Sequence, residues 1–445
     1  MKSVFVKNIL DNDIATVHSL SGWVKAKRES KQTVFFDLAD STGHIQLVLE
    51  KAAVGNDLFD LAKKTTVESA ISVSGTAEVG DLKKKEIKVS SFSVISKSTK
   101  HYTPELRSDF NIFDEKYTNQ ILSNKHLYVR NPKLMAIQKF RNLLLYYMRT
   151  WFFENNFTEI ATPILSPIPL YDDSTAMAVT VSKNKNEQTV FLSQCAGYYL
   201  EASAMAFERV YSISPSFRDE ESKSPRHLLE YWHIKAEFAF GNIEDIIQAV
   251  ESILKYLTEK LKEKEEIAEL FQVLGTELCL DGLSIPFPRI SYEDAIIFLQ
   301  KKGCEVTFGE SISSQEEEKL LFEKFKSPFW ITGIPRKIEP FPYSIDEKDA
   351  RITKTADLIG SNLKGELLGV AEKIYTIGML DERLKEKGKY GKEKYEWIRD
   401  IHQVGCVPHV AFGMGLERLV RWLMNIPHVR DVHPFPRIFD RKIVV

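Results

Sequence analysis

Charged side chains are concentrated in residues 217–240, FRDEESKSPRHLLEYWHIKAEFAF, between apolar runs. Arg218 and Glu220 precede a polar, proline-containing gap, and Arg226 and His227 follow it. This order predicts a hairpin in which two strands flank a polar loop. Arginine binds phosphate in a bidentate manner, so two arginines on one hairpin can hold separate phosphates of a nucleotide. A surface hairpin with ion pairs is the alternative interpretation.

A second cluster, AFGMGLERLVRWLM at residues 411–424, places two glycines before a charged helix start. Gly413 and Gly415 let the backbone pass close to a ligand or a neighbouring element. Arg418 follows in the first turn of a predicted helix. A closely packed strand–helix junction is the alternative interpretation. Tyr231, in the aromatic strand after the first cluster, is suited to lie under a purine ring.

The N-terminal part that accompanies these clusters is predicted to be a small β-barrel. Residues 17–98 form about five short alternating segments separated by turns, a pattern that favours an OB-fold. Adjacent aromatics Phe35 and Phe36 must point to opposite faces of a strand, so at least one belongs to the core. Basic residues beside aromatics suit single-stranded nucleic acid. The basic residues concerned are Lys25, Lys27, Arg28 and Lys31.

The remaining chain is predicted to mix helices and strands. Helical periodicity covers 132–156, strand residues continue to Pro163 and recur at 230–240, and 242–267 is an amphipathic helix with Asn242 as its N-cap. Further elements are a strand at 189–193, a helix from Gly197, a strand at 208–213, an ill-defined α/β portion at 268–330 and a helix at 415–425.

The composition is that of an ordinary globular protein, with 43% hydrophobic and 27% charged residues among 445. A net charge of −2 means that any nucleic-acid surface must be local. The four cysteines have no metal-ligand spacing, which favours reduced thiols over a zinc site or disulfides. No apolar run approaches the roughly 20 residues of a membrane span, and the N-terminus does not resemble a signal peptide. We therefore expect a cytoplasmic protein.

Taken together, FRDE, then RH, then GLER match motifs two and three of the class II aminoacyl-tRNA synthetases. The preceding helix and FTEIATPIL resemble motif one, which forms a dimer in that family. The barrel resembles the anticodon-binding domain of the aspartyl, asparaginyl and lysyl enzymes, and VPHVAFGMGLERLVRWLMNIPHVRDVHPFPR is most similar to the asparaginyl type. The resemblance implies an α+β chain with an OB-fold domain (1–100), a hinge (101–130) and a catalytic domain with an antiparallel sheet (131–445).

The same resemblance implies a role for each matching residue. Arg218 corresponds to the residue on the α-phosphate of ATP, Glu220 to the acceptor of the adenine amino group, and Tyr231 to the ring that stacks on adenine. The outer phosphates are assigned to Arg226, His227 and Arg418, magnesium to Asp357 and Glu366, and the anticodon to Arg28, Phe35 and Gln46. Hard carboxylate oxygens beside phosphates suit that ion.

The amino-acid pocket departs from the family pattern. Gly197 replaces a glutamine that helps to hold the substrate ammonium, and Lys235 replaces an acidic residue. The segment whose arginine binds the substrate side chain reads Gly369-Val370-Ala371-Glu372-Lys373, the glutamate-glycine of the mobile loop is replaced by residues 171–179, and PHSGFG has become PHVAFG with Val410 and Ala411. Reversing a charge about 4 Å from an ammonium changes attraction into repulsion.

Two functions therefore stay open. The first is an asparaginyl-type ligase that joins an amino acid to tRNA with ATP and Mg2+ in a homodimer. The second is a paralogue that activates another acid, one lacking the α-ammonium or carrying an extra carboxylate facing Lys235, and transfers it to an amine or ammonia. A non-catalytic tRNA-binding protein is disfavoured by the complete ATP set. Alternatively, Lys235 turns to solvent and a neighbour compensates for it.

Overall fold

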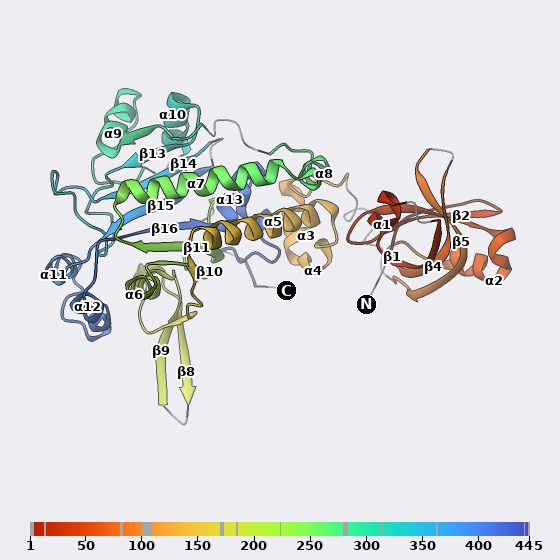
Figure 1. The fold of residues 1–445 in the computed structure, drawn as a ribbon, viewed down its shortest axis with the longest axis horizontal. Coiled ribbons are helices and arrows are strands. Elements are labelled where there is room, and N and C mark those ends of the chain that lie inside the picture. Colours follow the sequence, from red (N-terminus) through yellow and green to blue (C-terminus); the bar gives the residue numbers. More distant parts are fainter. Residues whose placement is uncertain are drawn as a thin grey trace. The chain divides into compact units, whose positions relative to one another are not determined.

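The structure is a computed structural model in which the chain divides into two compact units, Met1–Phe110 and Asn111–Val445 (Figure 1). It describes residues 4–12, 15–80, 83–99, 109–169, 173–183, 186–222, 224–278, 284–312, 315–361, 364–439 and 441–443. No helix within these described ranges is long and apolar enough to cross a membrane.

The first unit is a closed five-stranded barrel with strand order β1-β2-β3-β5-β4, which confirms the predicted OB-fold. Buried and half-buried residues alternate along β2, so Phe36 is in the core and stacks on Phe92, whereas Phe35 is only half-buried. The elements are α1 (Val6–Asp11), β1 (Thr16–Glu29), β2 (Thr33–Ala39), β3 (His44–Glu50), α2 (Lys51–Lys64), β4 (Ala70–Val79) and β5 (Lys85–Ser96).

The second unit is built on an eight-stranded sheet with the order β12-β13-β14-β15-β16-β11-β10-β6. Its central pairs are antiparallel, and the two outer pairs, β12–β13 and β10–β6, are parallel. The strands are β6 (Thr158–Glu159), β10 (Arg209–Phe217), β11 (Glu230–Ala239), β12 (Arg289–Ser291), β13 (Phe329–Thr332), β14 (Thr355–Gly360), β15 (Gly365–Lys373) and β16 (His409–Gly415). The predicted strand leading to Pro163 is thus only two residues long.

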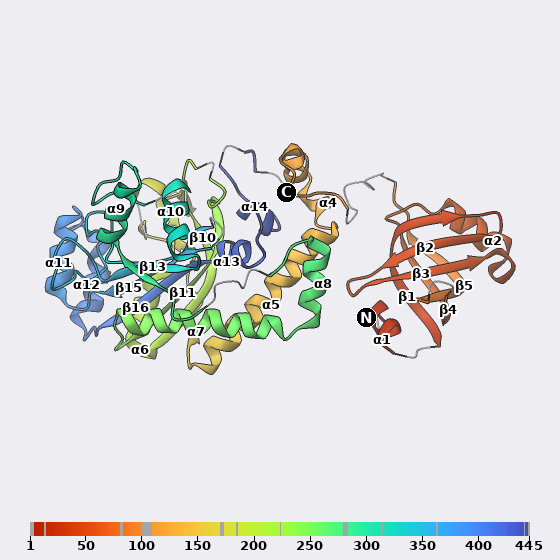
Figure 2. The ribbon, with the colours of Figure 1, turned by 90° about the horizontal axis from the view of Figure 1, so that it is seen from above.

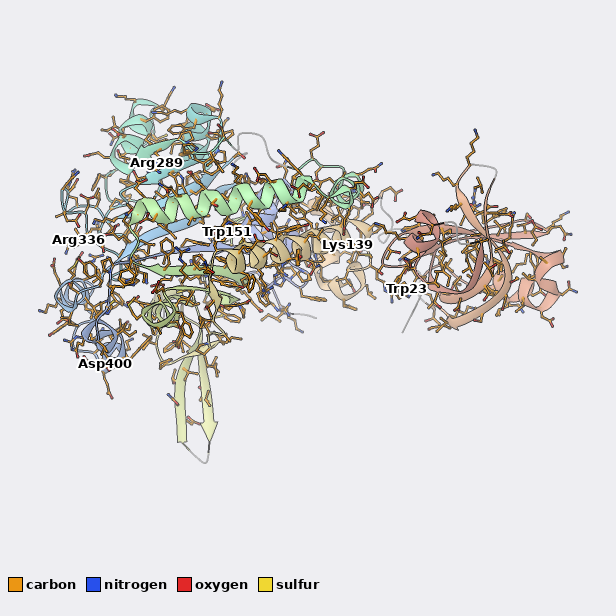
Figure 3. The ribbon with its side chains drawn as sticks, in the orientation of Figure 1. Trp23, Lys139, Trp151, Arg289, Arg336 and Asp400 are labelled. Atoms are coloured by element: carbon orange, nitrogen blue, oxygen red, sulfur yellow. The ribbon has the colours of Figure 1, made fainter. Side chains whose placement is uncertain are left out.

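Two long helices, α5 (Pro132–Glu154) and α7 (Ile243–Lys262), lie along one face of this sheet (Figures 1 and 2). Trp151 of α5, labelled in Figure 3, is buried and lies 5.9 Å from Phe157 between ring centroids. The Asn242 side chain accepts hydrogen bonds from the backbone of Glu244 and Asp245, as a capping box requires.

The predicted helix 242–267 is wrong at its end, because α7 stops at Lys262 and a separate helix, α8 (Glu265–Leu274), begins beyond a break. The break turns the apolar face of α8 toward α5, where Phe271 meets Phe140 edge to face. Residues 101–108 of the predicted hinge lie outside the described residues, and its later part carries η1 (Glu115–Tyr117), α3 (Thr118–Ser123) and α4 (Lys125–Tyr128).

The remaining elements surround the sheet. A three-stranded sheet, β7-β9-β8, includes a hairpin that extends away from the large sheet (Figure 1). Its strands are β7 (Leu165–Ser166), β8 (Ala178–Lys183) and β9 (Asn186–Leu192). The helices are η2 (Asp173–Thr175), α6 (Gly197–Phe207), α9 (Tyr292–Lys301), α10 (Gln315–Phe325), α11 (Ile377–Glu386), η3 (Glu393–Tyr395), α12 (Glu396–Gln403), α13 (Leu416–Leu423) and α14 (Val429–Val432).

Candidate functional site

A cavity of about 420 Å³ lies on the large sheet, with walls formed chiefly by β11, β14, β15, β16 and the β10–β11 connection. It brings together charged residues that are far apart in the sequence. Those that the sequence predicted and that line it are Arg218, Glu220, Arg226, His227, Tyr231, Lys235, Asp357, Glu366, Gly369, Lys373 and Arg418. The two motif clusters therefore share one cavity, because β11 and β16 are neighbouring antiparallel strands.

The β10–β11 hairpin positions Arg218 directly after β10, where its backbone N–H donates to the Leu229 carbonyl. The Arg218 guanidinium lies 3.5 Å from the Glu220 carboxylate and 5.8 Å from the centroid of the Tyr231 ring. The predicted hairpin is confirmed, and Arg218, Glu220 and Arg226 line the cavity. One arginine thus contacts both the acidic and the aromatic residue of the motif.

The loop of this hairpin holds His227 in a neutral form. Its Nδ1 lies 2.8 Å from the hydroxyls of both Ser222 and Ser224, and its Nε2 lies 3.6 Å from Glu220. Burial and the charge of Arg418 lower the pKa of His227 below its usual value. Although the Glu220 carboxylate opposes this effect, the net pKa is lowered, so at neutral pH the histidine offers polar atoms but no full charge.

Arg226 and Arg418 reach the cavity beside consecutive residues of β15. A Cβ at Gly365 would lie 2.2 Å from the Arg226 guanidinium, so only glycine fits beneath this side chain, and its φ of +76° suits glycine as well. Arg418 donates to the Glu366 carbonyl at 3.0 Å and lies 3.3 Å from its carboxylate. Partial burial would raise the pKa of Glu366, but Arg418 and Arg218 outweigh it and lower that pKa.

Three acidic residues gather at one side of the cavity, and two of them were predicted to bind magnesium. Burial raises the pKa of Asp357 well above its usual value, and the nearby charges of Glu366 and Glu339 raise it further. Such mutual repulsion is relieved by a divalent cation, and carboxylate oxygens are the ligands that Mg2+ prefers. The donor set therefore fits the ion. Glu339 was not predicted to be a site residue, because its segment, TGIPRKIEPF, contains none of the motifs used in the sequence analysis.

Glu339 is expected to make the fold less stable as the pH rises from about 4.5 to 7. Burial raises its pKa to about 7, above the usual 4.5, so the folded chain keeps a proton that the unfolded chain releases as the pH rises from 4.5 to 7. Stability is therefore lost over this window. A Glu339→Gln variant should be more stable than the wild type at pH 8, by on the order of 1–2 kcal/mol, and equally stable at pH 5. Thermal melting at both pH values measures this. An equal gain at both values, or the same gain in exposed Glu269→Gln, would contradict the account.

A fully buried group of charged residues lies at the inner end of the cavity. Lys373 Nζ lies 2.9 Å from Glu201 and 3.9 Å from Glu237, and the Nε2 atom of His409 lies 3.2 Å from Glu237. His402 lies 3.5 Å from the second Glu201 oxygen. Burial alone would raise the pKa of Glu201, but Lys373 and His409 outweigh it and lower it. The carboxylates raise the pKa of Lys373 in turn. This network explains how a lysine is accommodated at a predicted substrate contact.

The departures from the family pattern occupy the same region. Lys235 lies in the cavity wall, and a Cβ on Gly197 would be 3.2 Å from its Nζ. Gly369 faces Asp357 across β14 and β15, where an added Cβ would be 3.0 Å from the carboxylate. Ala411 lines the cavity, whereas Val410 is buried behind it. In the altered loop, 171–179, residues 171 and 172 lie outside the described residues.

Two more cavity residues were given no role from the sequence: Glu417, which belongs to the GLER motif, and His233. Glu417 accepts a hydrogen bond from the backbone of Trp232, and burial raises its pKa to about 7. His233 lies 3.2 Å from the Ser216 hydroxyl, and burial and the charge of Lys235 lower its pKa well below the usual value. Glu417 lies in the first turn of α13, and His233 lies on β11 opposite Gly415.

The barrel unit has its own polar cluster. Arg28 donates to the Gln46 side chain at 3.1 Å, and its guanidinium lies 5.6 Å from the Phe35 ring centroid. Gln46 donates in turn to Glu86 at 2.7 Å. Neighbouring strands bring the three predicted residues together, since β2 pairs with β1 and β3. The cluster combines a half-buried aromatic ring, on which a base can stack, with a cation that can contact a phosphate. This combination suits the binding of single-stranded nucleic acid.

Comparison with known families covers both units. Residues 117–438 match the model of the class II tRNA synthetases (D, K and N), and residues 18–95 match that of the OB-fold nucleic acid binding domain. Similar curated proteins include the asparagine–tRNA ligase of Pyrococcus abyssi, 34% identical over 430 residues, and that of Desulforamulus reducens, 34% identical over 427 residues. The matches span 94% and 95% of both chains, respectively.

Solved structures of similar proteins agree with these family matches. The crystal structure of asparaginyl-tRNA synthetase from Pyrococcus horikoshii with asparaginyl-adenylate aligns over 100% of both chains, with a TM-score of 0.89 and 30% identity. The Entamoeba histolytica asparaginyl-tRNA synthetase aligns over 95% of both chains with a TM-score of 0.82, but at 24% identity this likeness bears on the fold alone.

Proposed function

The chain belongs to the class II tRNA synthetases of the D, K and N group, and from this premise we propose that it adenylates a small amino acid and transfers it to tRNA. The relatives make asparagine the first amino acid to test. The observation that carries the proposal is one cavity lined by Arg218, Glu220, Arg226, Tyr231 and Arg418. None of the relatives named above supports transfer to a different acceptor.

In the proposed first step, a carboxylate oxygen of the substrate attacks the α-phosphorus of ATP, and the bond to pyrophosphate breaks. Negative charge spreads over the phosphate oxygens as this happens. Arg218, fixed by its backbone at the end of β10, neutralises charge at the α-phosphate. Arg226 and Arg418 hold the outer phosphates, and the Tyr231 ring lies under adenine. No side chain needs to act as a nucleophile.

We assign magnesium to Asp357 and Glu366, whose oxygens suit it. When bound, the ion would neutralise the phosphate oxygens. In the proposed second step, the terminal ribose hydroxyl of tRNA attacks the acyl carbon and AMP leaves. The barrel unit would hold the anticodon through Arg28, Phe35 and Gln46.

The direct test of adenylation is exchange of labelled pyrophosphate into ATP. We expect labelled ATP only when Mg2+ and an acceptable amino acid are both present. ATP turnover that does not depend on any acid would contradict the proposal. The assay needs no tRNA, so it separates activation from transfer.

The anticodon role of the barrel predicts a selective defect. Replacing Phe35 with alanine should weaken tRNA binding by about 1–3 kcal/mol, because a base loses its stacking partner. Pyrophosphate exchange should stay unchanged, because the two units are compact on their own. Filter binding and exchange, compared with exposed Asp57→Ala in the same unit as a control, measure both effects. A Phe35→Ala variant that binds tRNA like the wild type would argue against this site.

We also propose a homodimer paired through the region of α5. Two large apolar side chains of this helix are exposed, Tyr146 at 62% and Phe153 at 81%. Pairing would cover them. A monomer by sedimentation at micromolar concentration would contradict this proposal.

A further inference from the structure

Two lysines line the same cavity but differ in their partners. Lys373 is 3% exposed and is paired with both Glu201 and Glu237. Lys235 is half-buried, and within the described part of the chain its side chain has neither an ion pair nor a hydrogen bond. A cation that is partly removed from water without a counter-charge is unfavourable. Lys235 therefore differs from Lys373 in having its charge left uncompensated in the wall of the site.

The end of this side chain lies close to two glycines. A Cβ on Gly197 would lie 3.2 Å from Lys235 Nζ, and one on Gly413 would lie 3.5 Å from Lys235 Cε and 2.8 Å from the Nε2 atom of His233. The two glycines thus leave the space that the end of the lysine occupies. Gly197 also begins α6, whose first N–H groups have no partner within the helix and carry partial positive charge.

The other charged groups on this wall do not compensate Lys235. Arg218 and Arg418 add positive charge, and His233 is neutral because burial and the charge of Lys235 lower its pKa. Most acidic residues of the cavity lie beside the two arginines or around Asp357. Glu417 accepts a hydrogen bond from the Trp232 backbone, and Glu237, two positions beyond Lys235 on β11, lies beside Lys373 and His409. This part of the wall is therefore electropositive and suited to an anion.

The strand geometry separates this position from the reacting centre. Tyr231, which Arg218 covers, and Lys235 lie on the same face of β11 and are four positions apart along the strand. Their Cα atoms are about 13 Å apart, at roughly 3.3 Å per residue. A small acid whose reacting carboxylate meets the phosphate near Arg218 can therefore direct a second group toward Lys235.

We infer that the acid activated here carries a second carboxylate, which pairs with Lys235 between Gly197 and Gly413. This inference rests on the proposed adenylation and specifies its substrate class as a small dicarboxylate. The matched monocarboxylate amide would leave the lysine unpaired. Lys235 thus acts as a specificity-determining residue, while the arginines and Tyr231 bind the nucleotide.

Pyrophosphate exchange with two matched pairs tests this inference. Aspartate against asparagine and succinate against succinamate each differ only by a carboxylate in place of an amide. For at least one pair, we expect the wild type to have a kcat/KM about tenfold or more higher for the dicarboxylate than for the amide. A charge-assisted contact contributes a free energy of this size. Lys235→Gln should remove the preference and Lys235→Glu should reverse it, whereas exposed Lys348→Gln should keep it. Melting temperatures verify that all variants fold.

The outcomes separate the two proposals. Exchange that favours the amide in both pairs, or a dicarboxylate preference that survives in Lys235→Gln, overturns the inference and leaves adenylation intact. No exchange with any acid overturns the proposed function. In that case, calorimetric titration of succinate into the protein with a non-hydrolysable ATP analogue decides the inference. Binding that Lys235→Gln abolishes supports it, and no binding to the wild type contradicts it.

Discussion

Replacing Arg218 with alanine is expected to lower pyrophosphate exchange by about 10²–10³-fold, the usual effect of losing a preorganised donor at a developing negative charge. The loss should appear mainly in kcat, because the interaction strengthens as the phosphate reacts. Arg218→Lys should recover only part of the rate, since an ammonium does not reproduce the guanidinium fork.

The control for this prediction is Arg351→Ala, because Arg351 is 56% exposed and lies outside the cavity lining. Its exchange rate should match that of the wild type. Arg218 also contacts Glu220 and Tyr231, so circular dichroism and melting must first show that the variant is folded. A folded Arg218→Ala variant with near-normal exchange would exclude adenylation by this cavity.

Replacing Lys373 with methionine is expected to destabilise the second unit by about 3–5 kcal/mol, because Glu201 and Glu237 would remain buried with less positive charge beside them. Urea unfolding followed by tryptophan fluorescence measures this. Five of the six tryptophans lie in the second unit and only Trp23 lies in the first, so the signal reports mainly on the second unit.

A double variant tests the mechanism of that loss. Glu201→Gln combined with Lys373→Met removes one buried charge of each sign, so its destabilisation should be smaller than the sum of the two single changes. Exposed Lys348→Met should change stability by less than about 0.5 kcal/mol. Additive single effects, or a Lys373→Met variant as stable as the wild type, would contradict the coupled network.

Local pattern was enough to predict much of the fold. Alternation along residues 33–39 predicted the barrel strand that buries Phe36, and the Asn242 cap marked the start of α7 correctly. The end of α7 was not predictable from periodicity, because the charged run KLKEKEE continues the helical pattern across the break. Only packing of Phe271 against α5 shows that the chain turns there.

The candidate site shows the same division between local and long-range information. Arg218 and Arg418 lie in recognisable motifs, and the structure places both in one cavity. Glu339 joins that cavity from a segment with no motif, and Glu201 becomes a partner of Lys373 only through folding. Residues that come together only through folding form no recognisable pattern in the sequence. Their roles could therefore not be inferred from the sequence.

The most direct test of the account is acylation of tRNA labelled at its terminal adenylate, because this readout detects any acid that is transferred. Purified protein with ATP, Mg2+, tRNA and the matched acids should yield acylated terminal AMP after nuclease digestion. Arg218→Ala should abolish the product, and Phe35→Ala should reduce it. Robust pyrophosphate exchange without any acylated adenylate would contradict the account, because the activated acid would then pass to an acceptor other than tRNA.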